Sequence, residues 1–106
     1  MVTSKYKLDF MPLARDDLSN IFEYILHNLS SPTAAHRLMS RIEKATNNLR
    51  EMPFSAPMCM DDTLCEKGYR KLIIDHYILF FIVDKKKQEV IVMRVLYERR
   101  NYIPLF

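Results

Sequence analysis

Residues 69–97 read YRKLIIDHYILFFIVDKKKQEVIVMRVLY and contain three runs of β-branched and aromatic residues separated by polar links. The runs cover 69–74, 77–83 and 90–97, and each has the length and composition typical of a strand. The links are short enough to join antiparallel neighbours, although neither contains the usual glycine. The stretch therefore predicts three consecutive antiparallel strands.

Two helices are predicted ahead of these strands. Apolar residues recur at three- and four-residue steps over 14–29 and again over 35–52, which is the pattern of amphipathic helices. Ser31 is a candidate N-cap and Pro32 a candidate first helical residue, while Pro53 ends the second helix. Because the connection is so short, the two helices are expected to form an antiparallel hairpin.

The predicted fold is an α+β domain in the order strand, helix, helix, strand, strand, strand. The first strand comes from residues 5–10, where polar and apolar residues alternate. The helix hairpin is expected to pack on one face of a mostly antiparallel four-stranded sheet. A chain of 106 residues has room for one domain, which spans 1–106.

Composition excludes several classes of protein. Gly68 is the single glycine, so neither a P-loop nor a dinucleotide-binding fingerprint can be present. Cys59 and Cys65 do not make a disulfide scaffold, and both are expected to stay thiols. The longest apolar run, 77–83, is too short to cross a bilayer, and no signal peptide is recognisable. We therefore expect a cytoplasmic protein without a membrane partner.

Positive charge is concentrated in the last part of the chain. The formal net charge is +3, and residues 67–106 are clearly basic whereas the preceding part is slightly acidic. A basic half suggests an anionic partner. The competing interpretation is a solvated surface that keeps the protein soluble.

Simple hairpin registers would give the predicted sheet two different faces. The face expected to pack on the helices is almost entirely apolar and holds Ile73, Ile78, Phe80, Ile82, Ile91, Met93 and Val95. The opposite face, a candidate binding surface, mixes arginines with large apolar side chains. It holds Arg70, Leu72, Tyr77, Leu79, Phe81, Val92, Arg94 and Leu96. Alternatively, its arginines pair with carboxylates such as Asp75, Asp84 or Glu98.

These residues resemble the RelE/ParE superfamily of bacterial toxins. The resemblance covers essentially the whole chain in one order and implies the same β-α-α-β-β-β fold. It rests on Gly68-Tyr69-Arg70-Lys71-Leu72, Tyr77-Ile78-Leu79-Phe80-Phe81, Asp84, Val92-Met93-Arg94-Val95-Leu96-Tyr97 and Arg99-Arg100-Asn101-Tyr102, with Ala14, Asp17, Leu18, Ile21, Tyr24, Ile25, Leu49 and Pro53 in the helical part.

The resemblance implies a toxin encoded beside an antitoxin in a type II toxin–antitoxin module of a bacterium or of a plasmid that the module stabilises. The antitoxin wraps and blocks the toxin, and it makes the contacts when the complex represses its operator DNA. An apolar tail and the apolar open face would give the antitoxin something to cover. The expected antitoxin-binding residues are Leu72, Leu79, Phe81, Leu105 and Phe106.

The superfamily divides by target. RelE-like members cut mRNA in the ribosomal A site, without a metal or other cofactor, and need groups for proton transfer and cations for the phosphorane. ParE-like members inhibit DNA gyrase and are not nucleases. The candidate catalytic residues are Arg70, Arg94, Tyr97, Glu98, Arg99, Arg100 and Tyr102. The candidate contacts to RNA or another target are Lys71 and Tyr77.

The sequence also departs from the nuclease pattern. Tyr77 stands where the RelE-like nucleases place an arginine, and many members carry histidine at the position of Tyr97. The stretch 61–67 contains a single lysine where lysines are usual. His76 is expected to be a turn residue. The basic tail favours ribosome-dependent mRNA cleavage, and the alternatives are gyrase inhibition and a decayed toxin that retains only antitoxin binding.

Overall fold

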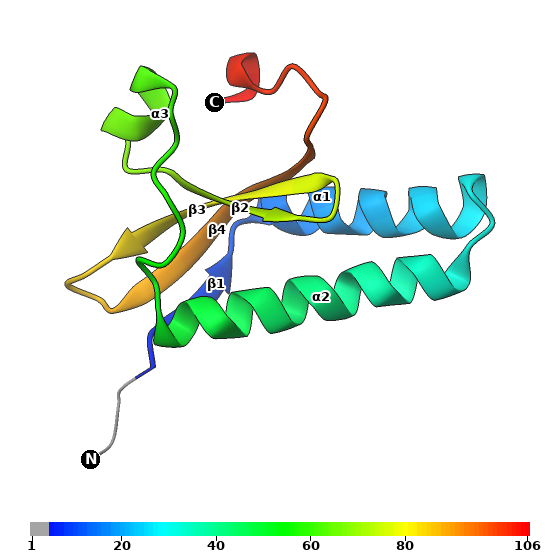
Figure 1. The fold of residues 1–106 in the computed structure, drawn as a ribbon, viewed down its shortest axis with the longest axis horizontal. Helices are drawn as coiled ribbons and strands as arrows, with labels where there is room; N and C mark the ends of the chain where they lie inside the picture. Colours follow the sequence, from blue (N-terminus) through cyan, green and yellow to red (C-terminus); the bar gives the residue numbers. More distant parts are fainter. Residues whose placement is uncertain (1–4) are drawn as a thin grey trace.

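The computed structural model describes residues 5–106, which form one layer of helices packed on a four-stranded sheet (Figure 1). The expected order of strand, helix pair and three strands is confirmed. No helix in the described part of the chain is both long and apolar enough to cross a membrane. The elements are β1 (Lys7–Phe10), α1 (Pro12–Glu23), the π-helical turn η1 (Tyr24–Asn28), α2 (Pro32–Glu51), α3 (Asp62–Glu66), β2 (Arg70–Ile74), β3 (Tyr77–Asp84), β4 (Glu89–Tyr97) and the 3₁₀ turn η2 (Ile103–Leu105).

The sheet has the strand order β1-β4-β3-β2. Strands β2, β3 and β4 are joined as antiparallel neighbours, as the short links predict. Strand β1 lies parallel to β4, with Leu8 opposite Val90. A parallel pair needs a long crossover connection, and the helix hairpin is part of it. The sheet is therefore mixed, with one parallel pair at one edge.

The helix hairpin is built from the stripe of apolar residues that the sequence shows. Pro12 and Pro32 begin the two long helices, and Ser31 is the N-cap of α2 without a side-chain capping bond. Leu38 and Leu49 of α2 are almost fully buried against the sheet. Each such side chain contributes roughly 1.5–3 kcal/mol by leaving water.

A β-bulge interrupts the pairing of β3 with β4. Phe81 pairs with Val92, but the next residue back, Phe80, pairs with Arg94, so Met93 is an extra residue in β4. Because side chains alternate between faces along a strand, one extra residue reverses the alternation beyond it. As a result, Val92 and Val95 both pack in the core beneath the helices.

The predicted assignment of the two sheet faces is wrong for most of its residues, although Val95 packs beneath the helices as expected. The helices cover the face of Leu72, Leu79 and Phe81, and the last two side chains are 0% exposed. Leu79 and Phe81 therefore lie inside the core and Leu72 packs against it, and none of the three is on the open face where the sequence placed them for antitoxin binding. Both faces are apolar because both are covered, so alternation alone could not tell which of them meets the helices.

The other face is covered by α3 and the C-terminal tail, which lie on the opposite side of the sheet from α2 (Figure 1). Phe80 is at its centre, and the rings of Phe106 and Tyr102 lie 4.9 and 5.0 Å from it, centroid to centroid. The expectation of an exposed apolar tail holds for Leu105, which is 37% exposed. It is wrong for Phe106, which is half-buried because Phe80 and Tyr69 pack against it.

Replacing Gly68 by alanine is expected to lower the free energy of unfolding by about 1 kcal/mol. Gly68 links α3 to β2 with a φ of +83°, a left-handed conformation that costs a residue with a Cβ atom. Nothing lies within 4 Å of a Cβ placed there, so no clash adds to this cost. Urea unfolding checks the value. Asparagine should lose less than alanine, and a loss above about 3 kcal/mol would contradict the argument.

Candidate functional site

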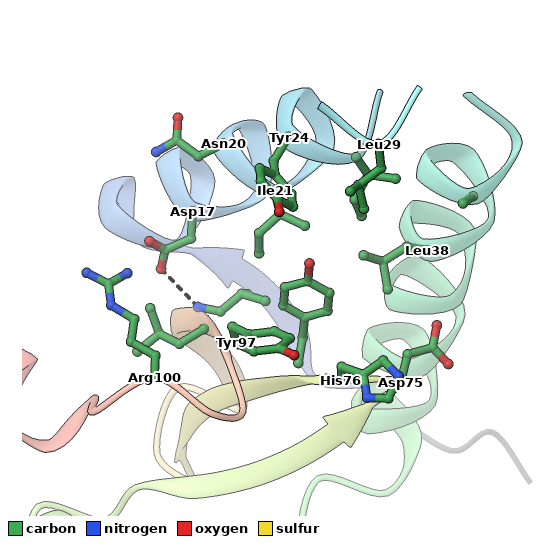
Figure 2. A pocket seen from close by; sticks show the side chains of 15 residues that line it. Asp17, Asn20, Ile21, Tyr24, Leu29, Leu38, Asp75, His76, Tyr97 and Arg100 are labelled. Atoms are coloured by element: carbon green, nitrogen blue, oxygen red, sulfur yellow. Dashed lines mark hydrogen bonds between the residues drawn. The ribbon is translucent and has the colours of Figure 1, made fainter. Parts of the chain in front are cut away.

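A cleft of about 740 Å³ opens between the helix hairpin and the turn that joins β2 to β3 (Figure 2). Its floor is apolar and comes from Ile25, Leu38, Val95 and Leu96. Polar and aromatic side chains surround the mouth, with Arg100 at one end and His76 at the other (Figure 2). A mostly apolar hollow with a few converging polar groups is the usual form of a binding site. The residues of the rim are Asp17, Asn20, Tyr24, Leu29, Asp75, His76, Tyr77, Tyr97 and Arg100.

An ion pair joins Asp17 of α1, which lines the cleft, to Arg94 of β4. The guanidinium Nε and Nη2 of Arg94 donate to the two carboxylate oxygens of Asp17 at 2.8 and 3.0 Å. The Val95 N–H also donates to Asp17, at 3.0 Å, and this bond is dashed in Figure 2. The side chains of Asp17 and Arg94 are only 11% and 14% exposed.

The hydrogen bonding of its guanidinium to the Asp17 carboxylate raises the pKa of Arg94. Arg94 therefore carries a permanent charge that Asp17 already neutralises. The interpretation that this arginine pairs with a carboxylate is confirmed, although its partner is on the first helix and not on the strands. Arg94 is a structural cation that joins α1 to β4.

Three tyrosines line the mouth of the cleft. The rings of Tyr77 and Tyr97 meet edge to face with centroids 5.7 Å apart. Tyr24 and Tyr97 are 51% and 43% exposed, which is high for such large side chains. Burial raises the pKa of Tyr77, and the neighbouring Tyr24 and Tyr97 raise it further. The Tyr77 hydroxyl is therefore less suited to act as a base near neutral pH than a free tyrosine.

His76 and Glu98 form a polar pair at the other end of the cleft. The Nδ1 atom of His76 lies 3.1 Å from Oε1 of Glu98, and the Glu98 N–H donates to the His76 carbonyl at 2.8 Å. Asp75, whose φ is 55°, forms an ion pair with Arg41 of α2. The turn that the sequence predicts here is thus tied to both α2 and the start of the tail.

The remaining predicted site residues are not brought to the cleft. Arg70 begins β2, and its Nη1 donates to the Ala56 carbonyl at 2.8 Å while its guanidinium lies over the Phe54 ring. The length of β2, roughly 13 Å from its first to its last residue, separates Arg70 from the turn at the cleft. Lys71 is close enough to Cys59 to oppose the rise that burial causes in the pKa of that thiol.

The predicted site residues of the C-terminal tail lie in different surroundings. Arg100 lines the cleft, and Arg99 is exposed. Tyr102 packs on Phe80 and belongs to the core cluster on the opposite face of the sheet. The cleft therefore gathers Tyr77, Tyr97 and Arg100, with Glu98 held beside them through His76.

Sequence reasoning missed three features of the cleft. It gave Asp17 no partner, because Arg94 lies 77 positions further along the chain. It placed Tyr24 in the first helix without a role, and the wide turn η1 that presents this ring has no clear signal in the residues. It gave His76 a turn position only, whereas the side chain also contacts Glu98.

Three solved structures with a similar fold are of toxin–antitoxin systems. The ParDE system of P. aeruginosa is 18% identical with a TM-score of 0.70, covering 88% of this chain and 96% of that one. The RelBE2 complex of Mycobacterium tuberculosis is 21% identical with a TM-score of 0.62, covering 91% and 94%. The RelBE complex of E. coli is 18% identical with a TM-score of 0.50, covering 90% and 99%. At these identities the likeness concerns the fold.

The family of this chain is shown by a comparison of its sequence with a family model. Residues 8–102 match the family model of the ParE toxin of the type II toxin–antitoxin system parDE. This match spans most of the chain, so the chain belongs to the ParE toxin family within the RelE/ParE superfamily. No curated protein sequence is similar enough to match it. The resemblance inferred from the strands and the tail is confirmed.

Proposed function

We propose that this toxin stops growth by binding DNA gyrase, without cutting RNA, and that a cognate antitoxin neutralises it. The observation that carries the proposal is the separation of the cations. Arg94 is neutralised by Asp17, and Arg70 is held at the far end of β2. Arg100 is the predicted catalytic arginine that lines the cleft.

RNA cleavage by the ribose 2′-hydroxyl makes demands that this arrangement meets poorly. The extra negative charge of the phosphorane needs cations that converge on one phosphate. A base must also take the proton of the attacking hydroxyl. Tyr77, which the sequence predicts as a contact to RNA or another target, is poorly suited to serve as that base because its pKa is raised.

Binding a protein target asks only for a complementary surface. Exposed aromatic side chains and arginine are the residues that most often dominate protein interfaces. The cleft presents Tyr24, Tyr97 and Arg100 in this way, above an apolar floor. Membership of the ParE family supports this choice of target, and the toxin–antitoxin complexes among the similar structures support a cognate antitoxin as partner.

We expect the purified toxin to inhibit ATP-dependent supercoiling of relaxed plasmid DNA by gyrase. Arg100→Ala should raise the concentration needed for half inhibition about tenfold or more, because an arginine that anchors an interface contributes at least about 1–2 kcal/mol. Arg37→Ala is the matched control, since Arg37 is exposed on α2 and does not line the cleft. Normal supercoiling at every toxin concentration, or equal losses for both variants, would refute the proposal.

One observation favours mRNA cleavage as a second candidate function. His76 and Glu98 form an imidazole–carboxylate pair at the same cleft as Tyr97 and Arg100. Such a pair can accept one proton and donate another during phosphodiester cleavage. The sequence favoured this function, whereas the positions of the arginines favour gyrase inhibition.

A further inference from the structure

Three consecutive lysines form the turn between β3 and β4. Lys85, Lys86 and Lys87 are all exposed. The turn is held in shape by its backbone, because the Lys87 N–H donates to the Asp84 side chain at 3.0 Å. The Lys7 N–H of β1 donates to the Gln88 carbonyl at 2.8 Å. The three ammonium groups are therefore displayed on a fixed support and not on a loose loop.

Phe54 joins this turn to Arg70. The Arg70 guanidinium carbon lies 4.9 Å from the centroid of the Phe54 ring, and the Lys85 Nζ atom lies 5.2 Å from it. A cation over an aromatic face is held by the quadrupole of the ring. Arg70 is fixed a second time by the Ala56 carbonyl. Cations from two separate segments are thus brought to one surface, which we call the lysine-turn surface and define as Phe54, Arg70 and Lys85, Lys86 and Lys87.

The charge of the lysine-turn surface is not balanced within the described part of the chain. Between residues 5 and 106, none of its four cations forms an ion pair. Two carboxylates flank the turn, Asp84, which accepts the Lys87 N–H, and Glu89, which is half-buried, so the four cations of the surface outnumber them. Positive potential therefore remains available to an anionic partner.

We propose that the lysine-turn surface binds the phosphodiester backbone of a nucleic acid, independently of base sequence. Lysine is depleted at protein–protein interfaces, and this turn, which projects at the end of the sheet (Figure 1), carries three exposed lysines in a row. A phosphate backbone needs only cations at intervals along its path, and lysine binds phosphate as a point charge. The surface lies away from the hairpin tip that borders the cleft, so both can be occupied together (Figure 1).

This inference goes beyond the proposed function. It gives the toxin a direct contact to nucleic acid, whereas the family resemblance assigns contacts with operator DNA to the antitoxin. A toxin held on DNA by this surface would be concentrated near an enzyme that works on DNA. The contact itself requires neither gyrase nor antitoxin.

Fluorescence anisotropy of the full chain with a labelled duplex of about 20 base pairs tests the proposal. Duplexes of DNA and of RNA with the same sequence distinguish the two sources of the phosphate backbone. We expect binding that weakens steeply with salt, with a slope of log K against log salt of about −3 to −4 for four phosphate contacts. The triple variant Lys85→Gln, Lys86→Gln, Lys87→Gln should bind at least about tenfold more weakly, with a slope near −1.

The matched control removes the same charge elsewhere. Arg37, Lys44 and Lys67 are exposed, and none forms an ion pair among residues 5–106. Their triple glutamine variant should keep most of the affinity and the slope. Equal losses of affinity in both triple variants would mean that binding depends only on the net charge of the protein, and this would overturn the proposal. A competition experiment gives a second way to overturn the proposal. If polyglutamate displaces the labelled duplex as effectively as unlabelled duplex does, the surface binds acidic protein equally well and is not specific for a phosphodiester backbone.

Discussion

The Asp17→Ala variant is expected to lose about 3–5 kcal/mol of unfolding free energy. Asp17 accepts three hydrogen bonds, two from the Arg94 guanidinium and one from the Val95 N–H. Its removal leaves a guanidinium that is 14% exposed without a counter-charge, and burial of an unpaired charge is costly. A domain of this size has a total stability of only about 5–15 kcal/mol, so the variant should be close to unfolded at 37 °C.

Urea denaturation followed by circular dichroism measures the loss. Asp16→Ala, which changes the exposed neighbour on the same helix, should stay within about 0.5 kcal/mol of wild type. Adding Arg94→Met to Asp17→Ala should restore much of the stability, because a buried pair can be replaced by apolar side chains at little cost. A loss below about 1 kcal/mol for Asp17→Ala would mean that the ion pair does not hold α1 to β4.

Phe81→Ala is expected to destabilise the fold by about 3–5 kcal/mol, the cost of a large cavity in a core. The Phe81 side chain is 0% exposed and lies in the core cluster beneath the helix hairpin. Thermal unfolding should show a midpoint many degrees below that of wild type. This variant tests which face of the sheet the helices cover.

Ile73→Ala supplies the comparison. Ile73 is on β2 but is 58% exposed, so its replacement should cost less than about 1 kcal/mol. The face assignment expected from simple alternation gives the opposite order, with Ile73 under the helices and Phe81 open to solvent. A larger loss for Ile73→Ala than for Phe81→Ala would therefore restore that assignment.

The four strands and the two long helices of this fold could be predicted from the sequence because each carries its own local signal, whereas the short elements η1, α3 and η2 were not predicted. The apolar steps of the helices, Pro12 and Pro32 at their starts and the polar links between the strands all agree with the structure. The parallel edge strand β1 follows once the helix hairpin is taken as a crossover. Local pattern and global fold are consistent, which is what a foldable sequence requires.

The faces of the sheet could not be predicted for two physical reasons. The tail and α3 cover the side of Phe80, so both sides of β3 are apolar and their alternation is uninformative. The extra residue Met93 then reverses the alternation within β4, and a bulge without glycine leaves no local signal. The expectation that Leu79 and Phe81 lie on an open face was wrong as a consequence of this one error.

The site was predicted only in part because it depends on distant pairings. Tyr97, Glu98 and Arg100 follow one another at the end of β4, so the sequence itself brings them near one another. The sequence left open whether Arg94 pairs with a carboxylate, and it did not indicate Asp17 of α1 as the partner. Such a pairing is a property of the tertiary structure, and composition or spacing carries no trace of it.

The most direct test of gyrase inhibition without RNA cleavage is primer extension on a reporter mRNA in a bacterial translation extract. The toxin is added at concentrations that inhibit supercoiling by gyrase. We predict intact mRNA, with the same 5′ ends in the presence and absence of toxin. The reason is that the arginines do not converge on one phosphate, because Arg94 is paired with Asp17 and Arg70 is held at the far end of β2. Discrete new 5′ ends that require active ribosomes would contradict the account and identify an mRNA-cleaving toxin.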